Sequence, residues 1–238
     1  MRDHLSLLTS SLAELGISPS REALERLIRL GELLIERNKE VNLTAIDDPR
    51  GVVLRHLADS AAVLAHLKGE RVIDVGCGAG FPGLPVKILA GDDLKMTLLD
   101  STGKKINFIK EVAGELGLKK VECLNARAEE VASSTPYRQS YSTVLSRAVS
   151  RLDMLSELCL PFCELGGVFL PHKGPRSEEE LSEALGGIKK LGGRYEGKTA
   201  YRTHPDEPEQ YVLHIIKVAP TPEAYPRAFA KIRSKPLR

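Results

Sequence analysis

The strongest constraint on the fold is a regular alternation of short apolar runs with amphipathic segments, which begins at Arg71. The apolar runs read RVIDV, MTLLD, VECLN, STVLSRA and GGVFLPHK, and helix-like stretches separate them. This alternation predicts an α/β fold in which a mostly parallel sheet has helices on both faces. Two further strand-like runs, GRYEGKTAYR and QYVLHIIKV, follow a polar helix near residues 177–190 and are separated by a short turn that contains proline. They predict a hairpin at the edge of the sheet.

Two flanking segments complete the predicted organisation. Residues 5–66 carry apolar side chains at helical spacing, and Ser18 with Pro19, like Asp48 with Pro49, are residue types that begin helices. The stretch from Pro220 is rich in arginine and lysine, and its prolines disfavour a long helix. We therefore expect a helical N-terminal extension over residues 1–68, a sheet domain over 69–219 and a basic C-terminal tail over 220–238.

The composition narrows the classes of function. The chain has 34 lysine and arginine residues against 32 acidic ones, so only local basic patches could bind nucleic acid. The four cysteines form no CxxC pair, and the closest two, Cys159 and Cys163, lie in an apolar stretch that reads as helix, so neither a zinc site nor a disulfide framework is expected. No apolar stretch is long enough to span a membrane. We expect a cytoplasmic monomer without a bound metal and without membrane contact.

The segment most indicative of a binding site is the glycine-rich turn Asp74-Val-Gly76-Cys-Gly78-Ala-Gly80-Phe81. It lies between the first predicted strand and a helix, where glycine allows both a tight bend and a close approach of backbone to ligand. The dinucleotide pattern GxGxxG fails, because counting from Gly76 puts Phe81 in the place of the third glycine. The acid two residues before Gly76 also argues against a bound pyrophosphate.

Asp100 ends the second predicted strand, where a carboxylate can accept both hydroxyls of a ribose. The ligand is therefore expected to contain a nucleoside. An acid before the glycines, the GxGxG turn and an acid after the next strand together resemble the class I S-adenosylmethionine-dependent methyltransferases. That resemblance implies a seven-stranded Rossmann-like sheet, with Asp74 and the glycines receiving the methionine part of the cofactor and Asp100 its ribose.

Two glutamates, Glu129 and Glu130, follow the third predicted strand at the place where such folds usually hold adenine. Acceptors at this place can meet the amino group of the base. Paired glutamates at the start of a helix are also common as surface charges that complement the helix dipole, so both interpretations stay open.

The end of the fourth predicted strand, Ser146-Arg147-Ala148, is where these enzymes meet the methyl acceptor. Methylation of exocyclic amino groups commonly uses a [DNS]PP[YFW] motif here, which this chain lacks. Methylation of a cytosine carbon needs a cysteine nucleophile, and none of the four cysteines lies in this loop. Both reactions are therefore disfavoured.

Taken with the flanking segments, the chain resembles the bacterial small-subunit ribosomal RNA guanine-N7 methyltransferases, also called the glucose-inhibited division protein B family. The resemblance covers nearly the whole length, although the tail segment Ala228–Ile232 departs from the family's pattern. The residues that carry it are Asn38, Asn42–Ile46, His56, Asp59–Ser60, Asp74–Pro85, Leu99–Ser101, Lys104–Lys105, Ala128–Glu129, Ser146–Ala148 and Lys173–Gly174.

This resemblance implies transfer of a methyl group from S-adenosylmethionine to N7 of one guanine, nucleotide 527 in the usual numbering, in the decoding-region loop of 16S rRNA, with S-adenosylhomocysteine as the other product. Because N7 carries a lone pair and no proton at neutral pH, in-line attack needs no general base. Together with the glycine-turn reasoning, the resemblance gives a set of expected cofactor contacts and two expected residues of the catalytic centre. The contacts are Gly76, Gly78, Phe81, Asp100, Ala128, Glu129 and Arg147, and the centre contains Arg147 and Lys173, which we expect to orient guanine O6, a phosphate or the cofactor carboxylate.

The expected macromolecular partner is 16S rRNA or the small ribosomal subunit. Lys104 and Lys105 near the cofactor site, with Arg227 and Arg233 in the tail, are candidate phosphate contacts, although each could equally be a solvated surface charge. His56 and Asp59 are three residues apart on one helical face, which favours a structural hydrogen bond between them over a role in gripping RNA. Alternative functions are a methyltransferase that acts on a small molecule or protein, and a module that binds nucleotide or RNA without catalysis.

Overall fold

The computed structural model describes residues 1 and 4–238, and its core is one seven-stranded sheet. The strand order is β3-β2-β1-β4-β5-β7-β6. Strands β1 to β5 pair in parallel, and β7 is antiparallel to both β5 and β6. The expected mostly parallel sheet is therefore confirmed. The strands are β1 (Arg71–Val75), β2 (Lys95–Asp100), β3 (Val121–Asn125), β4 (Tyr141–Arg147), β5 (Cys163–Lys173), β6 (Gly193–Tyr201) and β7 (Gln210–Lys217).

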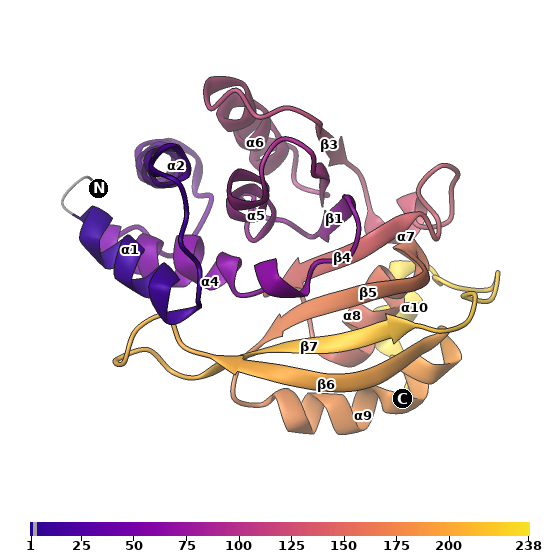
Figure 1. Ribbon diagram of the computed structural model, residues 1–238. Coiled ribbons are helices and arrows are strands. Elements are labelled where there is room, and N and C mark those ends of the chain that lie inside the picture. Colours follow the sequence, from indigo (N-terminus) through magenta and orange to yellow (C-terminus); the bar gives the residue numbers. More distant parts are fainter. Residues whose placement is uncertain (2–3) are drawn as a thin grey trace.

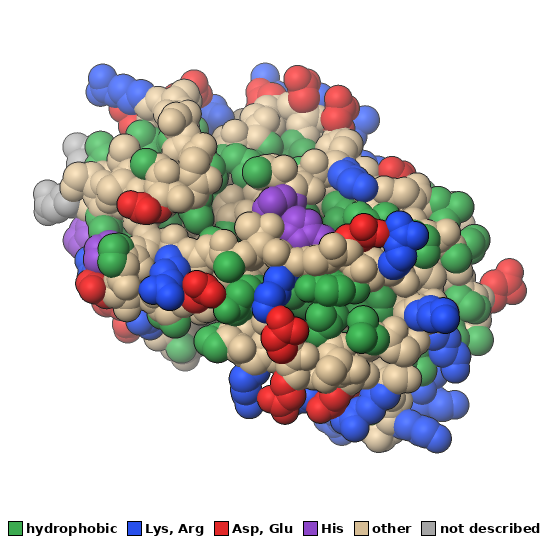
Figure 2. All heavy atoms as spheres, turned by 60° about the horizontal axis from the view of Figure 1, so that its bottom comes forward, with side chains coloured by type: hydrophobic (Ala, Val, Ile, Leu, Met, Phe, Trp, Pro, Cys, Tyr) green, Lys and Arg blue, Asp and Glu red, His purple; other side chains and the backbone are tan. Residues whose placement is uncertain are grey.

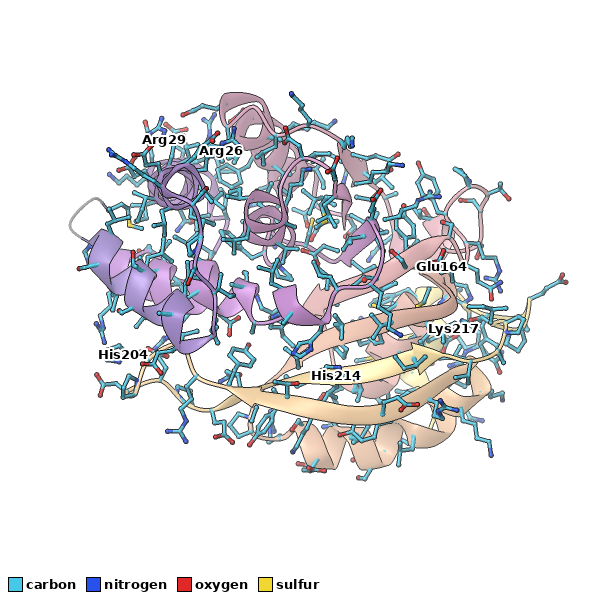
Figure 3. The ribbon with its side chains drawn as sticks, in the orientation of Figure 1. Arg26, Arg29, Glu164, His204, His214 and Lys217 are labelled. Carbon is cyan, nitrogen blue, oxygen red and sulfur yellow. The ribbon has the colours of Figure 1, made fainter. Side chains whose placement is uncertain are left out.

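The predicted hairpin forms between β6 and β7, and its second strand inserts beside β5, so β6 is the edge strand. The loop between the two strands reaches the N-terminal helices, where His204 lies beside them (Figure 3). The Arg50 guanidinium contacts His204 Nδ1 at 3.5 Å, and Arg55 forms an ion pair with Glu207 at 3.1 Å. The hairpin therefore joins the sheet to the N-terminal extension.

Helices cover both faces of the sheet (Figure 1). One hydrophobic core joins the N-terminal helices to α5 (Gly83–Ala90) and α6 (Gly103–Glu115). The second core, on the other face, contains α8 (Leu152–Cys159), the 3₁₀ turn η4 (Leu160–Phe162), α9 (Ser177–Lys190) and part of α10 (Phe229–Ser234). The short α7 (Ala128–Val131) follows β3. No helix in the described part of the chain is long and apolar enough to cross a membrane.

The N-terminal extension is helical, as expected, apart from irregular turns, the longest of them between residues 42 and 48. It contains α1 (Leu5–Glu14), α2 (Arg21–Val41), α3 (Pro49–Gly51), the π-helix η2 (Val52–Ala58), α4 (Asp59–Ala61) and the 3₁₀ turn η3 (Leu64–His66). Two start signals were predicted and one is wrong. Asp48 caps its helix, but α2 begins after Ser20 rather than Ser18, because Ser20 Oγ is placed to accept the Ala23 amide at 3.2 Å.

One further expectation needs correction. Cys163 is not helical: α8 ends at Cys159, the 3₁₀ turn η4 with Pro161 follows, and Cys163 pairs with Tyr141 as the first residue of β5. Residues 220–238, which we call the C-terminal strap, pack against the sheet domain. The Arg138 guanidinium donates to the carbonyls of Thr221, Pro222 and Tyr225, and the strap ends against α9.

Candidate active site

A cavity of about 430 Å³ opens where β1, β2, β3 and β4 end. Parallel strands bring the residues that follow them to one edge of the sheet, where ligands of such folds bind. The walls come from the glycine turn, the ends of the next three strands, the N-terminal extension and the C-terminal strap. The residues that line the cavity include Thr44, His56, Gly76, Gly78, Phe81, Asp100, Lys105, Ala126–Glu129, Arg147–Val149, Leu158 and Phe229.

The glycine turn forms the floor of this cavity. Gly76 and Gly78 have φ angles of +71° and +58°, which side chains with a Cβ rarely adopt. A Cβ added at Gly78 would meet only the Lys105 ammonium, at 3.9 Å, so it would project into the open cavity. The turn therefore leaves room for a ligand to lie directly on the backbone.

Asp100, at the end of β2, lines the cavity and has its carboxylate fixed by the backbone. Its Oδ2 accepts the Gly78 amide at 2.9 Å and its Oδ1 accepts the Thr102 amide at 2.8 Å. A carboxylate oxygen has two acceptor sites, so each oxygen keeps one for a ligand hydroxyl. The two backbone bonds fix the carboxylate in an orientation suited to a vicinal diol.

Asp74 lies elsewhere than expected. Its side chain is fully buried and does not line the cavity. Oδ2 accepts the Gly83 amide at 2.8 Å, at the start of α5, and Oδ1 has no partner among the described residues. Burial raises the pKa of this carboxyl to about 7. Asp74 therefore fixes the start of the helix that follows the glycine turn and offers no group to the cavity.

The paired glutamates after β3 have different environments. Glu129 is half-buried and lines the cavity with Ala126 and Ala128, whereas Glu130 is exposed and does not. The structure thus brings one of the two carboxylates to the expected adenine side and leaves the other as a surface charge on α7.

Arg147, at the end of β4, lines the cavity on the side away from the residues after β3. Its Nη1 donates to Asp59 Oδ2 and to the Arg55 carbonyl, both at 2.6 Å, and its Nη2 lies 3.0 Å from His56 Nδ1. The expected direct bond between His56 and Asp59 is wrong, because the Arg147 guanidinium lies between the two side chains. The arginine thereby joins the sheet to the N-terminal extension.

The imidazole of His56 is neutral near pH 7. Burial and the adjacent Arg147 charge lower the pKa of His56 to about 3. Since Nδ1 must accept from Arg147, the ring proton is on Nε2 and points to Thr44 Oγ1 at 2.9 Å. The ring also stacks on Phe81 with 4.6 Å between centroids. His56 and Phe81 therefore form one fixed wall.

Thr44 reaches the cavity from the turn that follows α2. Asn38 holds this turn: its Oδ1 accepts the amides of Leu43 and Thr44, and its Nδ2 donates to the Thr44 carbonyl. Thr44 Oγ1 accepts from His56 and from the Ile46 amide, so its own proton remains available to a ligand. Asn38, Thr44 and His56 are among the residues that carry the family resemblance, but their sequence positions did not predict that Thr44 and His56 line this cavity.

A second cavity, of about 580 Å³, lies on the other side of Arg147. Among the residues that the structure describes, His56, Arg147 and Ala148 alone line both cavities. Its other walls come from β5, from the loop between β6 and β7, and from the N-terminal extension. They include Ile46, Asp59, His172, Lys173, Gly174, Tyr201, Thr203 and Gln210.

Lys173 belongs to this second cavity and is nearly buried. Its ammonium donates to Glu180 Oε2 at 2.7 Å and to the Ser150 carbonyl at 2.8 Å. It therefore ties the loop after β4 to α9. Asp59, which pairs with Arg147, also accepts the Tyr201 hydroxyl at 2.7 Å.

The four candidate RNA contacts have unlike environments. Lys105 lines the mouth of the first cavity and Arg233 is exposed on α10. Lys104 donates to the Val41 carbonyl at 2.8 Å, at the end of α2. Arg227 forms a two-point ion pair with Glu157, whose side chain is fully buried, so a phosphate would have to compete with that carboxylate. No group of three His, Cys, Asp or Glu side chains suited to a metal ion occurs in the described residues.

Comparison with known proteins adds the chemistry that this geometry leaves open. Residues 23–196 match the family model described as rRNA small subunit methyltransferase G. A ribosomal RNA small subunit methyltransferase G from Lachnoclostridium phytofermentans is 40% identical over 240 residues, covering 100% of this chain and 98% of that protein. Its counterpart from Clostridium botulinum strain ATCC 19397 is 38% identical over 239 residues, with 99% and 100% covered.

Among solved structures, the fold is similar to that of a geranyl diphosphate C-methyltransferase from Streptomyces coelicolor, determined in complex with Mg²⁺, geranyl diphosphate and S-adenosyl-L-homocysteine. The TM-score is 0.51 at 15% identity, covering 68% of this chain and 79% of that one. At this identity the likeness concerns the fold alone, and it agrees with the class I methyltransferase architecture expected from the sequence.

Proposed function

The chain belongs to the rRNA small subunit methyltransferase G family, and from that membership and the site geometry we propose that it methylates N7 of one guanine in 16S rRNA with S-adenosylmethionine as donor. The guanine we propose is nucleotide 527 in the usual numbering, in the decoding-region loop. The observation that carries the proposal is a pair of cavities that meet at Arg147, one with glycine backbone and a fixed carboxylate, the other free for an acceptor.

The first cavity fits the cofactor in three places. The backbone of Gly76 and Gly78 would hold the methionine part, Asp100 would accept the ribose hydroxyls, and Ala128 with Glu129 would meet the adenine. The Thr44 hydroxyl, Phe81 and Arg147 close the opposite side. When bound, S-adenosylmethionine supplies an electrophilic methyl group on a sulfonium.

We place the acceptor guanine in the second cavity, with N7 directed past the Arg147 guanidinium toward the first cavity, so that the cation does not cover the N7 lone pair. Because N7 attacks through a lone pair, the chain needs no proton acceptor there, and none of its residues is assigned as a general base. The protein's contribution is to align the reacting atoms, an effect that reaches about 7–11 kcal/mol in favourable cases. A guanidinium cannot act as a base, so Arg147 serves to orient guanine O6 or the cofactor carboxylate.

Lys173 has a supporting role in this proposal. Its bonds to Ser150 and Glu180 hold the loop after β4, which carries Ala148 and Val149 along the cofactor cavity. An ammonium group has three donor hydrogens, and two of those of Lys173 already have partners. Lys173 therefore holds this loop and can donate to at most one polar atom of the acceptor.

The rRNA would lie over the mouths of both cavities. Lys105 is at the first mouth, and the strap carries Lys231, Arg233 and Lys235 exposed on or beside α10. On the face drawn in Figure 2, basic side chains gather toward the side on which the chain ends in Figure 1. Such contacts position the RNA backbone without reading its sequence. Lys104 and Arg227, which already have partners, contribute less.

Methyl-transfer assays with labelled S-adenosylmethionine test the proposal. The label should enter RNA when unmethylated small subunits or 16S rRNA are supplied, and the affinity for RNA should fall steeply with salt. Transfer to a small molecule or a protein without RNA, with little dependence on salt, would instead establish the alternative acceptor class. Binding of the cofactor or RNA without any transfer would indicate a non-catalytic module.

A further inference from the structure

Phe229 is the only residue of the C-terminal strap that lines the first cavity. It begins α10, is half-buried, and packs against the same core as Ala126 and Ala128. The Arg127 guanidinium lies over its ring, with the guanidinium carbon 5.3 Å from the ring centroid. The ring therefore lies at the side of the cavity formed by the residues after β3.

The strap is anchored immediately before this ring. The Arg227 guanidinium donates through Nε to Glu157 Oε1 at 2.8 Å and through Nη2 to Oε2 at 2.6 Å, and the Arg227 amide donates to Oε1 at 2.9 Å. Glu157 is fully buried in α8. A buried, two-point ion pair of this kind fixes both position and direction.

Two more contacts hold the strap after the ring. Ile232 is fully buried in the second core. Near the end of the chain, the Arg238 guanidinium lies 3.2 Å from Glu183, and the Leu237 carbonyl lies so close to Gly187 that a Cβ there would be 2.6 Å from it. Phe229 is thus held from both directions, so its place in the cavity wall is built into the fold.

We propose that Phe229 contacts the adenine ring of the cofactor, which makes the strap a structural part of the cofactor site in addition to its basic surface. This inference rests on the proposed cofactor. An aromatic ring can stack on any purine, and Glu129 on the same wall supplies an acceptor for an amino group. The wall can therefore contact both the flat ring and the exocyclic amino group of adenine. The ion pair of Arg227 then acts as a positioning contact for Phe229.

Calorimetry of the Phe229→Ala variant tests the contact. Two probes are used, S-adenosylhomocysteine and 5′-methylthioadenosine, which share adenine and ribose but differ in the amino-acid part. Loss of base stacking should weaken the binding of both by about ten-fold. Ser234→Ala, an exposed position on the same helix, is the matched control and should bind both like the wild type.

Unchanged affinity of Phe229→Ala for both probes, or weakening confined to S-adenosylhomocysteine, would overturn the inference. Phe229→Leu keeps apolar packing but has no ring, so it should also weaken both probes if the alanine variant does not fold. If the wild-type chain binds neither probe, the proposed cofactor itself is wrong, a result distinct from failure of the Phe229 contact.

Discussion

At the scale of single residues, Gly78 is the position where a side chain would most directly enter the cofactor cavity. Its added Cβ would face open space apart from Lys105, and its φ of +58° is unfavourable for other residues. Gly78→Ala should therefore lower cofactor affinity by at least ten-fold, and Gly78→Val should abolish binding. Titration of S-adenosylhomocysteine by calorimetry measures both.

The control for this variant is Gly117→Ala. Gly117 has a similar φ of +62° and no atom within 4 Å of an added Cβ, but it lies outside the cavity. It carries the same backbone strain, about 1–2 kcal/mol, without the obstruction. Equal affinity of the two alanine variants would contradict the placement of the cofactor on the glycine turn.

Arg147 is expected to affect stability as well as activity. Its side chain and that of Asp59 are 12% and 14% exposed, and they pair at 2.6 Å. Arg147→Ala leaves the Asp59 carboxylate without its cation, which should cost about 3 kcal/mol of unfolding free energy in addition to most of the methyl transfer. Urea unfolding measures the first and an RNA methylation assay the second.

The double variant Arg147→Ala with Asp59→Asn separates the two effects. Removing the uncompensated charge should restore part of the stability, while methylation stays low. Recovery of methylation along with stability would show that Arg147 acts only through folding and would remove it from the site.

At the scale of elements, the turn after α2 shows how a segment outside the sheet enters the site. Asn38→Ala leaves the amides of Leu43 and Thr44 without their acceptor, so the Thr44 hydroxyl should lose its fixed position. We expect kcat/KM to fall by about ten-fold with a loss of stability of about 1–2 kcal/mol. Lys39→Ala, on the same helix, is the control. Wild-type kinetics of the Asn38→Ala enzyme would show that this turn does not contribute to the site.

The buried histidines that join the extension to the sheet predict a pH dependence of stability. The pKa values of His56 and His172 are lowered to about 3 and about 4, in both cases mainly by burial. Below pH 6.5 the unfolded chain takes up protons that the folded chain cannot, so these groups make stability fall between pH 6.5 and about 4. His172→Gln should flatten that fall, as measured by urea unfolding across this range.

Asp74 makes the opposite contribution to the pH dependence of stability and can be compared with the histidines in the same chain. Its raised pKa, about 7, means that the folded chain holds a proton that the unfolded carboxyl has lost, so this group makes stability rise as pH falls from 7 toward 3.8. Asp74→Asn should remove this rise. Matching pH profiles for the wild type and both variants would contradict the burial of these groups.

The helices and strands could be predicted from the sequence more fully than the tertiary contacts between them. The alternation of apolar runs gave the strands, because a buried parallel strand must be apolar along its length. The glycine turn and Asp100 were found because their chemistry depends on local spacing. Thr44 and Phe229 were missed as cavity residues, since each reaches the cavity only through tertiary packing, and a periodic pattern carries no information about such contacts.

Two side chains, Arg227 and His56, have other surroundings than expected because of ion pairs between residues far apart in the chain. Arg227 appeared to be a free cation because its partner, Glu157, lies 70 residues earlier in the chain. The pairing of Arg147 with Asp59 spans 88 residues and displaced the local bond expected for His56. In both cases the ion-pair partner is distant in the chain, so the local sequence gave no sign of it.

At the scale of the whole molecule, three parts of the chain meet at the candidate site. The sheet domain supplies the glycine turn and Asp100, the N-terminal extension supplies Thr44 and His56, and the strap supplies Phe229. The first cavity therefore has all its walls only when the extension and the strap are packed on the sheet.

The most direct test of the central claim is to incubate the protein with labelled S-adenosylmethionine and unmethylated small subunits, digest the RNA to nucleosides and analyse them by mass. We predict a single labelled product, 7-methylguanosine, and mapping should locate it at one position in the decoding-region loop. Label in any other nucleoside, or label in protein with none in RNA, would contradict the proposed acceptor and the base-free reaction.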